Sequence, residues 1–368
     1  MSQTRYLKSM ITPTKVEPTT SDANIVGVAS GVWSVQDQLE ARRGGAWPDA
    51  SVADPDTLIE NNFSTSLYGG TGAAQSITND INLRDKGGMI WFKNRTLAED
   101  PMIVDTIRGG SADIYPNEAN AVDTDGNIAS FNSDGFTFTG NGRQNVDTYN
   151  YVSWTFKQAS KFFDIQTFTK TSGVETFSHN LGSVPGMIMI KRLNDAWDWY
   201  VYHRGMDSSA PEDYSMRLNT NSARSDASTH WNDTAPTSSI FTVGGGAPAG
   251  DYVAYIFAHE TGSDSMIQCG SYDGNESSPP TITLGWEPQW ILVKSITNTR
   301  NWAIFDTMRG LPVGFGDEYI SPNTNGAETT NNNQHFDINA TGFAPSSVET
   351  TVNGNSETYI YVAIRKPN

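Results

Sequence analysis

The chain contains a single cysteine, Cys269, so no disulfide bond can form within it. It also lacks any apolar run near the ~20 residues that a membrane-spanning helix needs. Its first residues, Met1 to Lys8, contain no apolar core typical of a secretion signal. We therefore expect a protein that is made in a cytosol, folds without disulfide support and does not insert into membranes.

Basic residues are scarce. The 368 residues include 24 Lys and Arg against 41 Asp and Glu, which gives a formal charge of −17. Binding to nucleic acid or to an anionic membrane depends on clustered Lys and Arg. The sequence has no extended cluster of this kind, so we expect neither partner.

Helical periodicity is absent from roughly the last 300 residues. Short apolar runs alternate there with turns rich in Gly, Asn, Ser and Thr, a pattern typical of β-sandwiches and barrels. Aromatic residues make up 11% of the chain and can fill several small cores. One short helix is predicted at 35–43, because Ser34 and Asp37 have the spacing of a capping box and Gly44 follows the helix.

One pattern occurs three times at intervals of about 100 residues, the size of a domain. An apolar strand ending in Lys is followed by an Arg-Gly step and then by an aromatic strand. The copies are Gly88–Lys93, Arg108-Gly109 and Tyr151–Phe156; Gly186–Lys191, Arg204-Gly205 and Tyr252–Phe257; and Gln289–Lys294, Arg309-Gly310 and Tyr359–Ile364. We predict an all-β fold with three homologous sandwich-like modules at 64–160, 161–262 and 263–368. An extended N-terminal arm, residues 1–63, precedes them, and the short linkers favour direct packing between modules.

Motifs for catalysis and metal binding are missing or incomplete. The sequence has no Gly-x-Ser-x-Gly motif and no His-Glu-x-x-His motif. Asp123–Asn127 has the alternating oxygen ligands of a calcium loop, but Ile128 stands where that loop needs Gly, so a surface turn is favoured. His203 occupies the position of Asp105 and Asp306 in the other copies, which indicates a polar edge or surface position. We predict no catalytic residue, no cofactor and no metal ligand, and we expect the Arg-Gly arginines to be structural.

The tryptophans divide into two groups. Trp91 aligns with apolar residues in the other copies, Met189 and Leu292, so this position is predicted to lie in the core. A second group of tryptophans lies among polar residues in loop-like stretches. Trp302 is included because it shares the repeat position of Trp199. Packing beneath loops is favoured for this group, but such rings can also stack on sugar faces. The four candidate contacts to a glycan or receptor are Trp197, Trp199, Trp231 and Trp302.

Several stretches carry a family resemblance: Thr71–Ile77, Phe131–Thr137, Phe163–Phe168, Ser178–Lys191 and Trp199–Gly205. On these stretches the chain resembles an uncharacterised β-repeat family of marine bacteriophage structural proteins, often labelled tail fibre. Residues 31–38 are also similar to a short segment common in phage virion proteins. The resemblance implies an oligomeric virion component that is synthesised in the host cytoplasm. It brings no catalytic residues with it.

The first hypothesis is therefore a bacteriophage virion structural protein, a tail fibre or a fibre-like host-recognition component. Residues 1–63 would dock to other virion proteins or sister subunits, and the modules would contact a host surface glycan or protein. A homotrimer is expected by analogy with fibres alone. One alternative is a capsid decoration or head-fibre protein. Another, of a different class, is a carbohydrate-binding or glycan-degrading enzyme, whose paired carboxylates can be remote in sequence.

Overall fold

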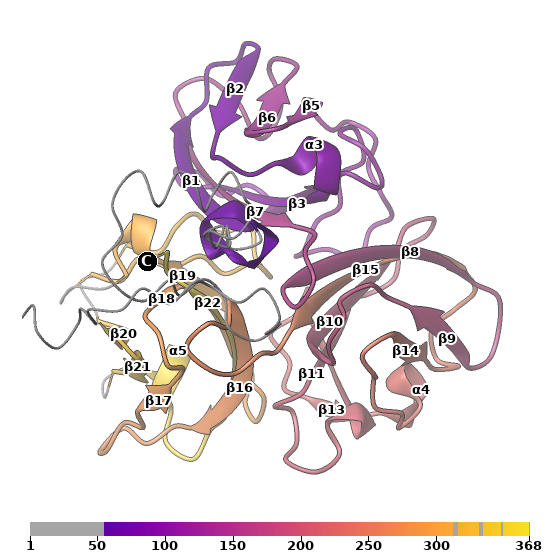
Figure 1. Ribbon diagram of the computed structural model, residues 1–368, viewed down its shortest axis with the longest axis vertical. Coiled ribbons are helices and arrows are strands. Elements are labelled where there is room, and N and C mark those ends of the chain that lie inside the picture. Colours follow the sequence, from indigo (N-terminus) through magenta and orange to yellow (C-terminus); the bar gives the residue numbers. More distant parts are fainter. Residues whose placement is uncertain (1–54, 312–315, 331–333, 347–348, 368) are drawn as a thin grey trace, which may run out of the picture. The chain divides into compact units, whose positions relative to one another are not determined.

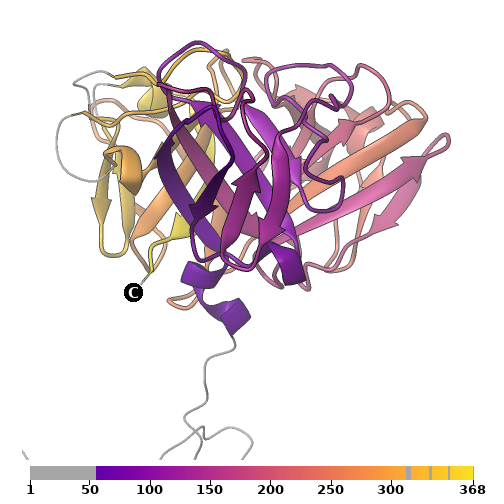
Figure 2. The same ribbon diagram turned by 90° about the horizontal axis from the view of Figure 1, so that it is seen from above.

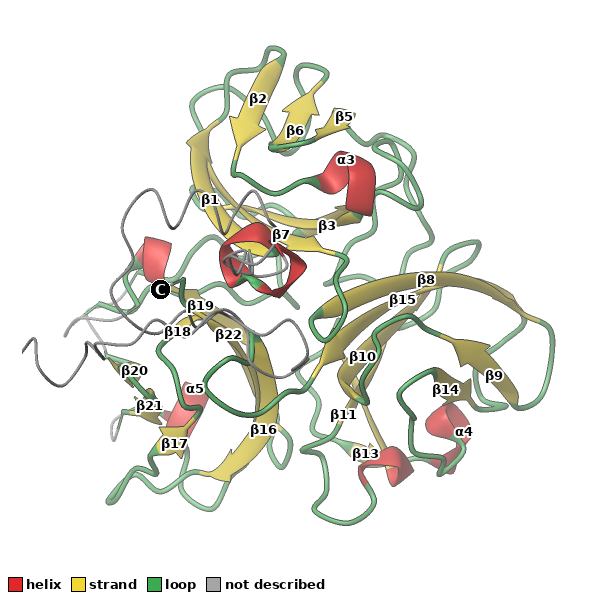
Figure 3. Cartoon of the chain, in the orientation of Figure 1, coloured by secondary structure: helices red, strands yellow, loops and turns green. Residues whose placement is uncertain are grey.

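The computed structural model describes residues 55–311, 316–330, 334–346 and 349–367. A compact unit begins at Asp56 and runs to the end of the chain. The predicted helix at 35–43 and most of the predicted arm lie outside the described residues. The prediction of an all-β, sandwich-like fold is confirmed: antiparallel strands dominate the unit, and its α-helices are only four residues long (Figure 3). None of the described helices has the length and apolar character needed to cross a membrane.

Three successive sets of strands make up the unit, and we call them the first, second and third repeats (Figure 1). The first repeat contains η1 (Pro55–Thr57), η2 (Ile59–Asn61), β1 (Phe63–Gly69), β2 (Gln75–Thr78), α3 (Leu83–Lys86), β3 (Gly88–Asn94), β4 (Met102–Asp105), β5 (Ile128–Asn132), β6 (Gly135–Phe138) and β7 (Asn150–Lys157). The second contains β8 (Phe163–Lys170), β9 (Glu175–Ser178), β10 (Pro185–Arg192), β11 (Tyr200–His203), η3 (Pro211–Asp213), β12 (Tyr214–Arg217), β13 (Ser225–Asp226), α4 (Ser228–Trp231), β14 (Ile240–Val243) and β15 (Gly250–Ala258). The third contains β16 (Ile267–Asp273), β17 (Ile282–Thr283), β18 (Pro288–Ser295), β19 (Ala303–Asp306), η4 (Thr307–Arg309), β20 (Phe336–Asn339), β21 (Gly342–Pro345), α5 (Thr350–Asn353) and β22 (Thr358–Arg365).

Each repeat has the same large antiparallel sheet. Its first strand pairs with its last strand, which pairs with the Lys-terminated strand and then with the short strand that follows. The orders are β1-β7-β3-β4, β8-β15-β10-β11 and β16-β22-β18-β19, with β12 and β13 extending the second sheet. A smaller sheet accompanies each: β2-β6-β5, β9-β14 and β17-β21-β20. The repetition seen in the sequence is therefore also a repetition of strand order.

The inner strands β3, β10 and β18 of the large sheets are buried on both faces. In β3, Ile90 and Phe92 face the small sheet of the same repeat. They pack with Phe136 and Phe138 in a core that belongs to the first repeat alone. Met89 and Trp91 belong instead to a larger cluster, which we call the shared core because all three repeats contribute to it. Its members include Trp91, Trp154, Phe156, Met187, Met189, Tyr255, Phe257, Trp290, Leu292 and Val362.

Tight turns precede the strands β6 and β21, and each of these strands begins with a glycine. Gly135 has φ of 144°, and a Cβ atom there would lie 2.0 Å from the carbonyl oxygen of Ile77 on β2. Gly342 has φ of 158° and the same close approach, 1.9 Å, to the carbonyl oxygen of Ile282. Only glycine permits both the backbone angle and the approach of the neighbouring strand. An Asp-Gly turn thus joins β5 to β6.

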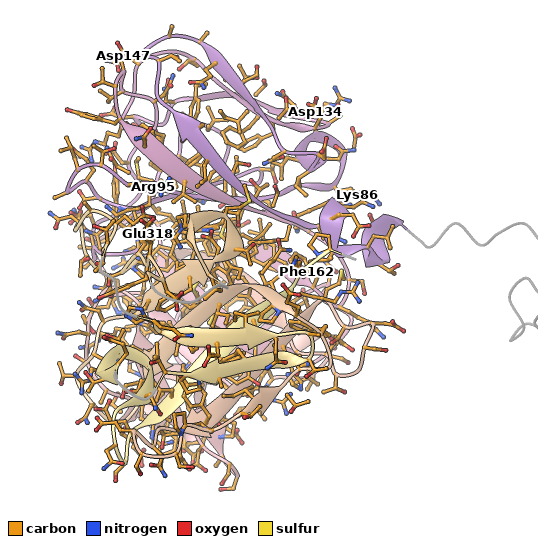
Figure 4. The ribbon with its side chains drawn as sticks, turned by 90° about the vertical axis from the view of Figure 1, so that its left-hand side faces the viewer. Lys86, Arg95, Asp134, Asp147, Phe162 and Glu318 are labelled. Atoms are coloured by element: carbon orange, nitrogen blue, oxygen red, sulfur yellow. The ribbon has the colours of Figure 1, made fainter. Side chains whose placement is uncertain are left out.

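The unit has two distinct ends along its strands (Figure 2). β1 starts at Phe63, opposite Phe156, and ends at Gly69, opposite Asn150. Residues 55–61 therefore lie at the Phe63 end, which we call the entry end. There Asp56 forms ion pairs with Lys157 (2.7 Å) and with Lys86 (3.0 Å), the latter labelled in Figure 4. The loops 70–74, 95–101 and 139–149 lie at the opposite end, the far end.

Candidate functional site

Asp105, His203 and Asp306 end the equivalent strands β4, β11 and β19, opposite Met89, Met187 and Trp290 respectively. The sequence predicted a polar edge or surface position, and that prediction is wrong. All three side chains have no exposed surface. They are buried because each one faces the last strand of another repeat across the shared core.

Their contacts form a cycle. Asp105 Oδ2 accepts a hydrogen bond from the Tyr255 hydroxyl of the second repeat, at 2.6 Å. His203 Nε2 bonds the carbonyl oxygen of Tyr361 in the third repeat, at 3.0 Å. Asp306 Oδ2 accepts from the indole Nε1 of Trp154 in the first repeat, at 2.8 Å. The first repeat thus contacts the second, the second the third, and the third the first.

The residue on each partner strand explains which side chain closes the junction. Trp154 and Tyr255 hold equivalent positions on β7 and β15, and each offers a hydrogen-bond donor to a carboxylate. Val362 holds that position on β22 and offers none. His203 instead donates to a backbone carbonyl, with the proton on Nε2 because Nδ1 accepts from the Gly205 N–H at 3.0 Å. An aspartate is therefore present where the partner strand offers a side-chain donor, and a histidine is present where the partner strand offers only a backbone carbonyl.

Backbone hydrogen bonds repeat the cycle at the far-end side of the sheets. In each case the N–H of a loop donates to the carbonyl two residues after the repeated Lys of another repeat. These bonds run from Val122 to Leu193 (2.9 Å), from Arg224 to Ile296 (2.9 Å) and from Glu328 to Arg95 (3.3 Å). Ion pairs reinforce the last one: Arg95 contacts Glu328 at 2.7 Å and Glu318 at 3.2 Å (Figure 4).

The tryptophans proposed as glycan contacts do not gather into one surface patch. Trp199 is fully buried, and its Nε1 donates to the carbonyl of Tyr115 in the first repeat (2.9 Å). Trp302, 1% exposed, donates likewise to the carbonyl of Arg217 in the second repeat (3.0 Å). Trp231 is 2% exposed beneath Tyr202. Trp197 is half-buried against Tyr200, at 4.3 Å between ring centroids. The first three rings offer no free face to a sugar, because they pack within or between repeats.

The repeated lysines are buried, and two of them bond across the junctions between repeats. Lys191 Nζ donates to the carbonyl oxygens of Ala119 in the first repeat (2.8 Å) and of Trp197 (2.6 Å). Lys93 Nζ donates to the carbonyl of Asn325 in the third repeat (3.0 Å). Lys294 Nζ bonds carbonyls of its own loop. Burial lowers the pKa of Lys93 and Lys191 to about 8 and that of Lys294 to about 7, because loss of water disfavours the charged ammonium more than the nearby carboxylates favour it.

The three Arg-Gly steps are not equivalent. Arg108 and Arg309 are buried, and in each the Nε atom pairs with the aspartate three residues earlier, at 2.6 Å. The expected structural role holds for these two. Arg204 directly follows His203, so its turn is two residues shorter and no aspartate precedes it at that spacing. Its side chain is exposed and lines a cavity of about 470 Å³. The sequence contained this difference in the spacing of the Arg-Gly step from the strand.

Residues 60–367 match a family described as a domain of unknown function, DUF7483. The chain belongs to the DUF7483 family. No curated protein matches it. The matched range spans all three repeats, so the DUF7483 domain is the whole cyclic assembly and not a single repeat.

The possible calcium loop of the DUF7483 domain is used for internal bonds. Asp123 accepts from the Tyr115 hydroxyl (2.9 Å) and from the Asp125 N–H (3.2 Å). The Asn127 amide donates to the carbonyl of Gly140 (2.7 Å). Within the part of the domain that the structure describes, no three His, Cys, Asp or Glu side chains are grouped to hold a metal ion.

Proposed function

We propose that this protein is a bacteriophage virion structural protein, a tail fibre or fibre-like host-recognition component that displays its DUF7483 domain from the particle. The observation that carries the proposal is the separation of the two ends of the domain. The chain enters at one end, beside Lys157, and the three segments that lead from a small sheet into the last strand of the large sheet lie at the other.

The buried polar groups of the domain support a structural role. Most of the buried polar groups described above hold one repeat to another: Asp105, His203 and Asp306, Lys93 and Lys191, and the indoles of Trp154, Trp199 and Trp302. Polar residues that recur at buried contacts between repeats stabilise the folded domain, since removal of one partner leaves a buried polar group unpaired. A domain closed on itself in this way suits a part that must stay folded when the particle strikes a surface.

The far end supports a recognition role. The segments that join β6 to β7, β14 to β15 and β21 to β22 differ in length and sequence although the strands around them are alike: 139–149, 244–249 and 346–357. Variable loops on a repeated rigid frame are where binding residues concentrate in proteins. We assign contact with a host surface glycan or protein to this end.

Attachment to the virion and assembly into a homo-oligomer, with a trimer as the proposed state, fall to the N-terminal arm. The shared core is filled by the three repeats of one chain, so the domain itself presents no need for sister subunits there. Other virion proteins would hold the arm.

Deletion of residues 1–54 tests the proposal. A deletion that extended past residue 55 would remove contacts of the domain itself, because Asp56 pairs with Lys157 and Ile59 is fully buried. The truncated protein should be soluble, with the melting temperature of the full chain, and should be missing from purified particles. The exposed-site variant Arg84→Gln in the full chain is the matched control and should be incorporated normally.

Incorporation of the truncated protein, or absence of the full chain from purified particles, would reject the proposal. The copy number of the full chain per particle then separates the two virion locations: few copies support a fibre, and a number comparable to that of the major capsid protein favours a decoration protein. Release of saccharides from host envelopes by the purified protein would favour the enzyme alternative.

A further inference from the structure

The second repeat differs from its neighbours at one charged residue. In the first and third repeats the guanidinium is buried against an aspartate and carbonyl oxygens, with Arg108 bonding Ala112 O and Ile103 O in addition to Asp105. His203 replaces that aspartate, and the shorter turn carries Arg204 away from it. A guanidinium cannot be buried without a counter-charge at acceptable cost, so Arg204 turns to solvent.

Arg204 does not point from a flat surface. It lines a cavity of about 470 Å³, within the range of about 300–1,000 Å³ usual for small-molecule sites. Val184, Pro185 and Pro236 supply apolar walls to this cavity, and Val184 is 52% exposed. The cavity lies beyond the end of β11, on the side of the sheet where β10 begins, so it is separate from the far-end loops.

Three further groups give the cavity its polarity. His259 lines it, and because its Nδ1 accepts from the Cys269 N–H (3.2 Å), the neutral ring carries its proton on Nε2 as a donor. Asp207 is already committed, since it accepts from the N–H and hydroxyl of Ser209 and pairs with Arg224 at 3.5 Å. The Glu212 carboxylate also lines the cavity and can accept hydrogen bonds from a ligand.

We propose that this cavity binds a sugar acid, with the ligand carboxylate on Arg204, its hydroxyl groups on Glu212 and its apolar face against Val184 and the prolines. A guanidinium binds a planar carboxylate through two parallel N–H···O bonds. The two acidic side chains disfavour a doubly charged phosphate in the same space, whereas a single carboxylate surrounded by hydroxyl groups meets both an anion site and hydrogen-bond acceptors.

This inference goes beyond host recognition by the far-end loops and does not depend on it. The probe is D-glucuronate, added to the purified full chain and followed by calorimetric titration, with D-glucose and inorganic phosphate as comparison ligands. A ligand of this size should bind with a Kd on the order of 1 mM. D-glucose, which lacks the carboxylate, should bind at least about tenfold more weakly.

Two variants test the residues. Arg204→Gln should weaken D-glucuronate binding by about tenfold or more, because it removes the charge-assisted pair. Since Arg204 is exposed, the Arg204→Gln protein should have the melting temperature of the unaltered chain. Arg84→Gln makes the same change of charge on a side chain that is 62% exposed in the first repeat, and it should leave binding unchanged. Val184→Trp should block the cavity while retaining Arg204.

The proposal is overturned by any of four results: no binding of D-glucuronate to the unaltered chain, equal binding of D-glucose, tighter binding of phosphate, or unchanged binding by Arg204→Gln. None of these results bears on incorporation of the truncated chain into particles, so this proposal and the proposed function can fail separately.

Discussion

Trp154 donates its indole N–H to Oδ2 of Asp306 over 2.8 Å, although the two residues lie 152 positions apart. Arg309 Nε contacts the same oxygen at 2.6 Å, and the guanidinium lies 5.2 Å from the centroid of the Trp154 ring. One carboxylate thereby joins β7 of the first repeat to the turn after β19 in the third. The first repeat also contacts the second, and the second contacts the third, so this bond closes the cycle.

Replacement of that carboxylate should destabilise the whole domain. Asp306→Ala leaves the Trp154 N–H without its acceptor and Arg309 with Glu328 at 3.1 Å in place of two carboxylates, so we take the lower end of the usual cost of breaking a buried ion pair, about 3 kcal/mol. We expect the free energy of unfolding in urea to fall by this amount. Asp85→Ala is the control: its side chain is 59% exposed, and the free energy of unfolding should stay close to that of the unaltered chain. A loss below about 1 kcal/mol for Asp306→Ala would contradict this account of the junction.

The sequence predicted that the aligned positions Trp91, Met189 and Leu292 lie in the core, because an apolar residue stands there in every repeat. It did not predict the junctions, because a polar residue within a run gives no sign of the residue it faces. Asp105 and His203 at one position suggested tolerance of polarity, whereas each is matched to a different partner. The matching was present in the aligned strands: aspartate occurs with Tyr255 or Trp154, and histidine occurs with Val362.

For the second tryptophan group the sequence favoured packing over contact with a sugar, and three of the four rings are buried, but their partners could not be predicted. Trp199 has polar neighbours in sequence, Asp198 among them, and such surroundings suggested a loop. In a strand or at its edge, adjacent side chains point in opposite directions, so polar neighbours do not exclude burial. The indole N–H of Trp199 is satisfied by the Tyr115 carbonyl, 84 positions earlier in the chain, and local sequence carries no signal of that contact.

The stability of the domain should rise with pH above neutrality because of Lys294. Its pKa is about 7 in the folded protein against an ordinary value of 10.5, so the unfolded chain binds more protons between these values. The free energy of unfolding therefore increases as pH rises through this window, by up to about 1.4 kcal/mol per pH unit. Lys294→Met should make the slope shallower, as measured by urea unfolding between about pH 7 and 9.5.

Lys366→Met is the control for this slope. Lys366 also carries one positive charge, but its side chain is 49% exposed, so the pH dependence of stability should match that of the unaltered chain. Lys93 and Lys191 remain in both variants and contribute above about pH 8. An unchanged slope in Lys294→Met would show that Lys294 does not lose its proton in the folded protein.

Asp113 should act in the opposite sense and at lower pH. It is 2% exposed, its Oδ2 accepts from Gln144 Nε2 at 3.1 Å, and burial raises its pKa to about 6. The folded state thus retains a proton that the unfolded state releases between about pH 4 and 6, and the stability present below pH 4 is lost as pH rises through this window. Asp113→Asn keeps an acceptor for Gln144 without the charge. We expect it to be more stable than the unaltered chain by about 2 kcal/mol at pH 8 and about equal at pH 4. A gap that does not widen with pH would refute this.

The repeats should not fold separately. In the first repeat, Trp91, Trp154 and Phe156 face the shared core and are fully buried only because the other repeats cover them. A fragment of residues 55–160 would expose these rings, and exposed apolar patches of this kind drive aggregation. We expect that fragment to be insoluble or unfolded, whereas residues 55–368 unfold in a single transition that coincides by circular dichroism and by tryptophan fluorescence. Two resolved transitions, or a soluble fragment with a native near-ultraviolet spectrum, would mean that each repeat is stable by itself and that the junctions only dock finished units.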